Sequence, residues 1–471
     1  MSKQNSTDNN KEKDASNVPK FGVRHIQALL CFTLLAVGYS MRMNISVAIE
    51  AMTQPTSDNP DIPVFDWTDQ SLVLASFFWG YWCTQTPAAF LGKKYGPKWF
   101  LTIVMSLNSI LCAITPLVAE HLGSKGVMVI RVIQGLSQGF LFPSVHTMLT
   151  NWAPLPERSG MNGFVYSGAT IGTVIVMPVT GFISESWVGW PTSYYLFAGI
   201  GVVWTIAWVF LGANKPSLHK YISKEEREYI EKSLGHEDHK EHNTPWREIL
   251  TSRPFFGIVV TSISVGFGNT FLLTETPTYM NKILGLDISK NSTLSAAPSL
   301  AGFLALLVIS PLSDFLINRN ILSRLLTRKI FNTIGTVVPA IGMTAISFLP
   351  KDQVNLSVAL LIFNGAVGSG YTCGAMVNLL DLSPNHGGIL MGLANGCGNI
   401  FANFGPLIVQ YVVTDTTNQS QWRIVFILSA CVYIVADCIY LIFASTDVQS
   451  WNEESHDTIE NYEKDDPKFK V

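Results

Sequence analysis

The chain has 471 residues, a length that would suit two or three soluble domains. Only 14% of its residues are charged, against about 25% in soluble proteins, and its mean hydropathy is positive at +0.28. The net charge of -3 argues against a protein that binds nucleic acid through a basic surface. All seven cysteines lie in apolar stretches without a Cys-x-x-Cys pair, which indicates packing residues and not a disulfide framework or a metal site.

Twelve apolar runs follow one another along the chain, each long enough to cross a bilayer core of about 30 Å. They lie near 26–49, 70–91, 99–118, 127–149, 160–183, 194–212, 255–279, 292–316, 330–349, 356–379, 388–412 and 424–445. We therefore predict an all-α polytopic membrane protein of twelve transmembrane helices in two six-helix bundles, at 25–213 and 254–446. Residues 214–253 form a polar linker between the bundles, and residues 1–24 and 447–471 are predicted to be tails, the first of them disordered.

The distribution of Lys and Arg predicts the side of the membrane that each polar segment faces. Segments that would be cytoplasmic contain 24 of the 31 Lys and Arg residues, whereas segments that would be outside contain five. Because cytoplasmic loops carry an excess of positive charge, both termini are predicted to be cytoplasmic. Three candidate glycosylation sequences then lie on the outside, at Asn291, Asn355 and Asn418.

Small residues and prolines recur at matching places in the two halves. Gly135 and Gly139 in the fourth run have the spacing that lets membrane helices approach closely, and similar pairs occur in runs five, ten and eleven. Pro178, late in the fifth run, corresponds to Pro406, late in the eleventh. Two related bundles with equivalent small residues are typical of transporters built from structural repeats.

Arg42 and Arg131 are charges inside predicted membrane helices. An arginine at mid-membrane costs at least about 2.5 kcal/mol and usually faces a cavity or a partner, so each is a candidate functional residue. Counted along their helices, both lie in the outer half of the membrane, within reach of one anionic substrate. The alternative is that the protein neutralises each arginine itself, and the acidic candidate at similar depth in the first half is Glu50.

Three other titratable residues lie in predicted membrane segments. Glu275 is interpreted as a proton or sodium site, or as an ion-pair partner of one of the arginines. His146 is a candidate proton relay, or else a packing residue. Asp437 has no obvious partner in the sequence, and we interpret it as a buried neutral or peripherally hydrated carboxyl group in preference to a functional one.

Other motifs give no sign of catalysis. The histidine-rich run at 236–242 does not fit His-Glu-x-x-His and lies in the polar linker, which favours a solvated loop. The chain has no phosphate-binding loop of the Gly-x-x-x-x-Gly-Lys-Ser/Thr type, and no catalytic constellation is recognisable. We expect the protein not to be an enzyme.

Several sequences along the chain are similar to those of one transporter family. They are RMNISVAI (42–49), SFFWGYWCTQTP (76–87) and RVIQGLSQG (131–139) in the first half, and DLSP (381–384), GILMG (388–392) and WRIVF (422–426) in the second. With them, residues 21–452 resemble the anion-cation symporter family of the major facilitator superfamily, which includes sialin, the vesicular glutamate transporters and the type I sodium-phosphate cotransporters. The segment LTETPTYM (273–280) looks most like invertebrate inorganic phosphate cotransporters.

The resemblance implies roles for individual residues. Arg42 and Arg131 match the family's substrate-binding arginines, and Tyr81 matches a cavity-lining tyrosine. Gln138 stands where sialin and the glutamate transporters have a proton-coupling glutamate, and with Tyr81 it is expected to be a polar group of the substrate cavity. Leu74 and Val265 replace a histidine and an arginine of the glutamate transporters, which argues against vesicular glutamate loading. Asp314 and Arg319 keep the family's gating motif after the eighth run.

The resemblance implies a secondary active transporter that carries inorganic phosphate or a small organic anion together with sodium or a proton, by alternating access. Because Gln138 cannot titrate, sodium is favoured over a proton. The alternatives are a sialin-like, proton-coupled exporter of organic anions in an acidic organelle, and an anion sensor that does not transport. We expect no cofactor beyond the co-transported ion, a monomer in the bilayer, and no nucleic-acid partner. The N-terminal tail lacks an acidic dileucine signal, which favours the plasma membrane over lysosomal or vesicular membranes.

Overall fold

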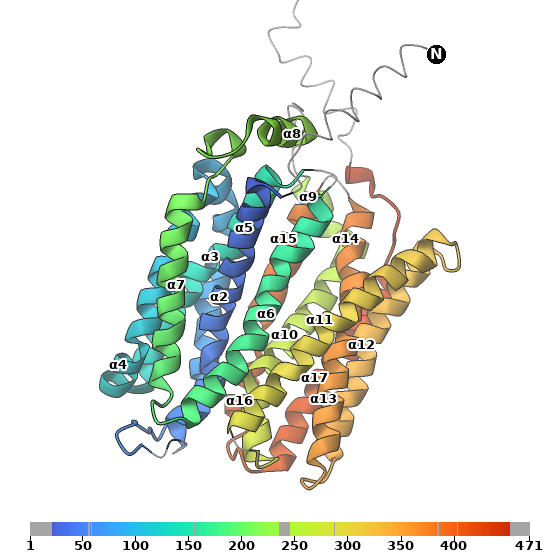
Figure 1. Ribbon diagram of the computed structural model, residues 1–471. Helices are drawn as coiled ribbons and strands as arrows, with labels where there is room; N and C mark the ends of the chain where they lie inside the picture. Colours follow the sequence, from blue (N-terminus) through green and yellow to red (C-terminus); the bar gives the residue numbers. More distant parts are fainter. Residues whose placement is uncertain are drawn as a thin grey trace, which may run out of the picture. The chain divides into compact units, whose positions relative to one another are not determined.

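The computed structural model of the protein is built from helices (Figure 1). It describes residues 21–54, 57, 59–154, 157–234, 245–286, 288–383, 386–402 and 404–452, and none of these residues forms a strand. The histidine-rich run at 236–242 and most of both predicted tails lie outside the described residues.

The chain divides into two compact units, Met1–Asp238 and His239–Val471. The helices of the first unit are α2 (Val23–Thr53), α3 (Gln70–Tyr95), α4 (Pro97–Gln138), α5 (Leu141–Trp152), α6 (Arg158–Glu185), α7 (Pro191–Leu211), the short η1 (Pro216–Leu218) and α8 (Lys224–Leu234). The helices of the second unit are α9 (Trp246–Thr251), α10 (Arg253–Lys282), α11 (Ile288–Asn318), α12 (Arg324–Phe348), α13 (Val354–Gly368), η2 (Thr372–Met376), α14 (Val377–Leu382), α15 (Gly387–Ala402), α16 (Phe404–Val412), α17 (Gln419–Phe443) and η3 (Ser450–Asn452).

These helices cover all twelve predicted apolar runs. In the described parts of the chain, nine helical stretches are long and apolar enough to span a membrane. One of them contains both the third and the fourth run, because α4 continues through a kink at Gly123, whose φ of 63° interrupts the helical geometry. The tenth run is divided among α13, the π-helical turn η2 and α14, and the eleventh between α15 and α16.

The two units pair their helices in the same way. In the first unit α2 packs on α6 and α7, α3 on α4, and α4 on α7. In the second unit α10 packs on α15 and α17, α11 on α13, and α12 on α17. If the six apolar runs of each unit are numbered from one to six, the same pairs are in contact in both units. Run one packs on runs five and six, run two packs on run four, and run three packs on run six. The repeat that the glycines suggested is therefore present in the packing.

Close backbone contact explains two of the glycines. A Cβ atom at Gly135 of α4 would collide with the carbonyl oxygen of Phe77 on α3, and one at Gly172 of α6 would collide with that of Ala36 on α2. The second unit uses other positions, because Gly392 and Gly396 have open space around them, whereas Gly398 of α15 lies against Ser262 of α10. The repeat therefore conserves which helices pair, but not the glycine position that permits each contact.

The linker helix α8 is fastened to the start of α2 (Figure 1). Glu226 of α8, 1% exposed, accepts hydrogen bonds from the backbone N–H groups of Val23 and Arg24 at 2.9 and 3.0 Å. A carboxylate at this position satisfies the free N–H groups of a helix N-terminus. The Arg24 guanidinium also pairs with Glu226 at 3.1 Å and with Glu157, just before α6, at 2.9 Å. Two carboxylates from distant parts of the chain thus fix one end of the first unit.

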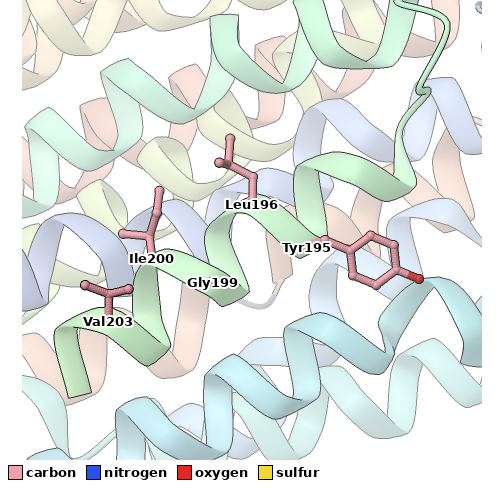
Figure 2. Close-up of a pocket in the computed structure, with 5 residues that line it drawn as sticks. All are labelled: Tyr195, Leu196, Gly199, Ile200 and Val203. Carbon is pink, nitrogen blue, oxygen red and sulfur yellow. The ribbon is translucent and has the colours of Figure 1, made fainter. Parts of the chain in front are cut away.

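The outer face of α7 is apolar and open. Tyr195, Leu196, Gly199, Ile200 and Val203 line a shallow pocket along it, and the side chains drawn in Figure 2 point away from the helix axis. An exposed apolar stripe on a helix of 21 residues suits contact with lipid acyl chains. The pocket offers no charged group to an anion.

Candidate anion site

The two membrane arginines meet inside the first unit. Arg42 on α2 is 7% exposed and Arg131 on α4 is 4% exposed. The Arg131 side chain crosses to α2, where its Nη1 donates a hydrogen bond to the backbone carbonyl of Arg42 at 3.2 Å. A second, long contact of 3.5 Å joins Nη1 to the Gln134 amide oxygen. The structure therefore brings together the two residues that the sequence predicted to share a substrate.

Aromatic rings surround the Arg42 guanidinium. Its Cζ atom lies 4.6 Å from the ring centre of Phe77, 4.8 Å from Phe78 and 5.0 Å from Tyr81, all on α3. Tyr39, one turn earlier on α2, is 5.2 Å away, and Phe77 also lies 4.8 Å from the Cζ atom of Arg131. Ring faces attract a cation electrostatically but do not neutralise it as a carboxylate would. The positive charge of both arginines is therefore held in place and still available.

Neither arginine has an acidic partner among the residues that the structure describes. The Nε atoms of Arg42 and Arg131 are buried and make no hydrogen bond there. Glu50, the acidic candidate in this half, lies two turns beyond Arg42 and accepts a hydrogen bond from Gln54 at 2.9 Å. Since a buried charge is strongly unfavourable unless it is paired, this arrangement favours an anion that comes from outside the protein.

The local fold explains why these groups meet. Gly135 lets α4 approach α3 closely enough for the backbones to touch at Phe77, and Arg131 precedes Gly135 by one helical turn. Phe77 and Tyr81 are four residues apart, so both rings project from the same face of α3 toward α2 and α4. Their ring centres lie 5.5 Å apart in a stacked arrangement.

Gln138 is buried and held by neighbouring groups. Its amide nitrogen donates hydrogen bonds to the carbonyl of Gly38 on α2 at 3.2 Å and to the amide oxygen of Asn108 on α4 at 3.1 Å. Asn108 in turn donates to the Ser137 hydroxyl at 2.7 Å. Both N–H groups of Gln138 are therefore used inside the protein, where they tie α2 to both halves of α4.

His146 of α5 lies at one end of an aromatic row. It is exposed, and its Nδ1 is 3.3 Å from the hydroxyl of Tyr166 on α6. Tyr166 stacks on Phe142, and Phe142 meets the edge of Tyr39, which also contacts Arg42. The row connects the predicted relay histidine to the arginines through ring contacts.

The predicted coupling and gating residues Glu275, Asp314 and Arg319 lie in the second unit. Glu275 is on α10 and is 1% exposed. Asp314 and Arg319, at the end of α11, are both exposed, and the described residues show no ion pair between them; the Arg319 guanidinium instead lies 5.8 Å from the Phe315 ring. At this end the ion pair is formed by Arg328 of α12 and Asp381 of α14, at 2.7 Å.

The predicted prolines and glycosylation sites fall as follows. Pro178 lies within the continuous α6, and Pro406 lies in the first turn of α16. Asn355 is exposed in the first turn of α13, and Asn418 caps α17 by accepting a hydrogen bond from the Ser420 N–H at 3.0 Å. The side chain of Asn291 lies outside the described residues.

The sequence analysis missed the rings that hold the arginines. Phe77, Phe78 and Tyr39 were not singled out, because aromatic residues are common in membrane helices. Tyr39 precedes Arg42 by three residues, which places the two side chains on one face of α2. That spacing was a usable signal, whereas the approach of α3 could not be seen from α2 alone.

Comparison with known proteins gives the family. The model of the major facilitator superfamily matches residues 29–349 and 320–464. A Drosophila melanogaster protein named "Putative inorganic phosphate cotransporter" is 35% identical over 93% of this chain and 88% of its own length. The chain belongs to the major facilitator superfamily.

Other relatives and solved structures agree with this facilitator fold. Human sialin is 32% identical over 92% of this chain and 91% of its own length, and zebrafish (Danio rerio) vesicular glutamate transporter 3 is 34% identical over 91% and 74%. A bacterial homolog of the human lysosomal transporter Spinster superposes with a TM-score of 0.69 at 13% identity, covering 90% of this chain and 97% of that chain. A D-xylose-proton symporter gives 0.67 at 16% identity, with 90% and 99% covered.

These matches confirm the resemblance and the predicted fold. The chain is an all-helical, multi-pass membrane protein of the group that contains the phosphate cotransporters, sialin and the vesicular glutamate transporters. Major facilitators are solute transporters and not enzymes, so the expectation of a non-enzymatic protein holds.

Proposed function

We propose that this facilitator is a secondary active symporter, which carries inorganic phosphate or a small organic anion together with a cation, sodium or a proton. The observation that carries the proposal is the pair of buried arginines, Arg42 and Arg131, which have unpartnered Nε atoms and no acidic neighbour in the described residues. The names of its relatives, which include phosphate cotransporters and sialin, support the same substrate class.

The co-transported cation follows from the charge of the substrate. Moving one negative charge into a cell with a negative interior costs about 2.3 kcal/mol per 100 mV. An uptake carrier for an anion therefore needs an inward cation, and alternating access of two related units is the mechanism that such folds use. We place the protein in the plasma membrane, where a sodium or proton gradient can drive uptake.

Uptake into proteoliposomes tests this function. Purified protein is given radiolabelled phosphate, glutamate or sialic acid under imposed sodium or proton gradients at controlled voltage. We expect accumulation of one of these anions, dependent on one cation gradient. A second assay without any gradient measures counterflow, the exchange of external labelled anion for internal unlabelled anion. Wild-type protein that shows no counterflow of any of the three anions would contradict the proposed function.

Variants of the arginines test the site. Loss of a charge-assisted hydrogen bond costs about 1.5–3 kcal/mol, so Arg42→Gln and Arg131→Gln should raise KM for the anion about 10- to 100-fold. The matched control is Arg247→Gln, an exposed arginine of α9 outside the predicted membrane segments. Wild-type KM in Arg42→Gln protein that is normally inserted would refute the assignment.

A further inference from the structure

A buried carboxylate joins two helices of the second unit. Asp437 of α17 is 2% exposed and lies six residues before the end of its helix, which is about 9 Å along the axis. Its Oδ1 accepts a hydrogen bond from the Asn332 amide nitrogen at 2.8 Å, and its Oδ2 accepts one from the Thr333 hydroxyl at 2.9 Å. Both donors come from α12.

This carboxylate has no positive partner. Within the part of the chain that the structure describes, no Lys, Arg or His forms an ion pair with Asp437. The nearest cations on α12 are engaged elsewhere, since Lys329 donates to the carbonyl of Leu441 at 2.8 Å and Arg328 pairs with Asp381. An unpaired carboxylate in a membrane helix is costly, and a neutral amide could join the helices more cheaply, so an acidic side chain here indicates a function.

We propose that Asp437 is the site that binds and releases the co-transported proton. The inference rests on the proposed cation-coupled anion transport and names its cation. The hydrogen-bond pattern favours a proton over sodium, because Asn332 and Thr333 both direct hydrogens at the carboxylate. A sodium ion would need oxygen ligands from both side chains in place of these hydrogens, whereas a proton needs a single acceptor.

The side-chain amide of Asn332 can accept the hydrogen bond that a protonated Asp437 must donate. When a proton is added to Asp437 Oδ1, that atom becomes a donor and faces the Asn332 N–H group, which is also a donor. Rotation of the amide presents the Asn332 Oδ1 atom, which is buried and makes no hydrogen bond among the described residues. The proton then lies between Asp437 Oδ1 and Asn332 Oδ1, and the Thr333 hydroxyl stays on the other carboxyl oxygen.

A π-helical turn lies directly against the α12 backbone at Asn332. The backbone of η2 touches α12 at Gly374, where a Cβ atom would fall 2.6 Å from the backbone nitrogen of Asn332. Single π-helical turns inside helices occur frequently at functional sites, since their backbone is less regular. Arg328 also donates to the carbonyl of Cys373 in the same turn at 3.0 Å. The residue that binds Asp437 therefore lies where α12 packs against η2.

Few other titratable groups face this site. On α17 the Tyr440 hydroxyl accepts a hydrogen bond from Asn378 of α14 at 3.0 Å. On α12 the neighbours are Lys329 and Arg328, the latter with its partner Asp381. Between Arg253 and Glu275, α10 has no titratable side chain, and η2 contributes Cys373. Asp437 is thus the acidic group of α12, α17 and η2, and Asp381, on the following helix α14, is paired with Arg328.

The test separates exchange from coupling. Proteoliposomes receive radiolabelled phosphate, glutamate and sialic acid in two assays, counterflow without any cation gradient and accumulation driven by an inward proton gradient. Asp437→Asn should keep counterflow within about twofold of wild type and reduce proton-driven accumulation to background, because an amide cannot carry the proton. Asp352→Asn, an exposed aspartate of the same unit, is the control and should leave both assays unchanged.

The outcomes distinguish this inference from the proposed function. Proton-driven accumulation by Asp437→Asn at the wild-type level would overturn the inference. Wild-type protein that accumulates anion only with a sodium gradient would also overturn it, but would leave the proposed function standing. Wild-type protein without counterflow would overturn the proposed function itself.

A milder variant decides if Asp437→Asn does not fold. Thr333→Val removes one hydrogen bond to the ionised carboxylate and so favours its protonated form. The midpoint of the pH dependence of proton-driven accumulation should rise by about one pH unit. Thr344→Val on the same helix, whose hydroxyl donates to the backbone carbonyl of Ala340, should not shift it. An unchanged midpoint in Thr333→Val would overturn the inference.

Discussion

At the scale of single residues, different side chains of the first unit position the two arginines and join the helices. Phe77 contacts both guanidinium groups, with ring-to-Cζ distances of 4.6 and 4.8 Å. Gln138 makes no hydrogen bond to either guanidinium group in the described structure. Its amide nitrogen donates to the Gly38 carbonyl and to the Asn108 amide oxygen. Mutation of Phe77 should therefore affect anion binding, whereas mutation of Gln138 should affect the stability of the fold.

Phe77→Leu should weaken anion binding. The substitution keeps an apolar side chain but removes the ring face that positions both arginines, an interaction worth about 0.5–2 kcal/mol. We expect KM in counterflow to rise about 2- to 30-fold, with the amount of folded protein unchanged. Phe100→Leu, which disrupts the stacked pair with Phe140 in the same unit, is the control and should leave KM unchanged. A KM equal to wild type in Phe77→Leu would show that the rings do not position the arginines.

Gln138→Leu should lower stability and leave KM unchanged. The leucine removes two hydrogen bonds, and with them the one to the buried amide oxygen of Asn108, at about 1–3 kcal/mol; the Gly38 carbonyl keeps its helical hydrogen bond. The thermal unfolding midpoint in detergent should fall by several degrees, while KM of the remaining folded protein stays within about twofold. A large rise in KM at an unchanged midpoint would instead place Gln138 in contact with the substrate.

At the scale of elements, the sequence predicted helices well and their long-range contacts poorly. The predicted apolar runs coincide with helical segments, because hydropathy and length act locally. The kink at Gly123 falls in the break predicted between the third and fourth runs, whereas the π-helical turn η2, which interrupts the tenth run, was not foreseen. The contact of Arg24 with Glu226 joins residues 202 positions apart, and no local pattern in a single sequence could pair them.

Glu157 lies in this cluster between the start of α2 and α8, and it should make stability depend on pH. Burial alone would raise its pKa, but the hydrogen bond and charge of Arg24 outweigh that effect and hold the pKa of Glu157 below its ordinary value of 4.5. Its contribution is therefore fully present above pH 4.5 and is lost as the pH falls through the lower, folded-state value. Because the side chain is 31% exposed, the gain is at most about 1 kcal/mol.

The measurement is the difference in unfolding midpoint between wild type and Glu157→Gln across a pH series. The difference should be constant from pH 8 to about pH 6 and should shrink below about pH 5. Glu248→Gln, an exposed glutamate of α9, should show no such change. A difference that grows as the pH falls would contradict the assigned direction.

At the scale of the whole molecule, the ends of each unit can be told apart by their contacts. In the second unit the loops before α13 and α17 touch each other, since Lys351 donates to the carbonyl of Thr417 at 3.0 Å. The opposite end carries Arg328 with Asp381, and Lys329 with the carbonyl of Leu441. In the first unit, α8 marks the end at which α2 begins. The excess of Lys and Arg near α8 and the start of α12 predicts that these ends face the cytoplasm.

Labelling of single cysteines tests this orientation. In a background without the seven native cysteines, Asp352→Cys and Thr417→Cys lie on exposed loop positions at one end of the second unit, and Glu228→Cys lies exposed on α8. A membrane-impermeant maleimide should label the first two in intact cells and Glu228→Cys only after permeabilisation, because an odd number of predicted spans separates α8 from each of those two loops. Labelling of Glu228→Cys in intact cells would reverse the orientation. It would place Asp437, close to the end of α17 nearest Arg328, toward the outside, where it would exchange its proton with the external solution.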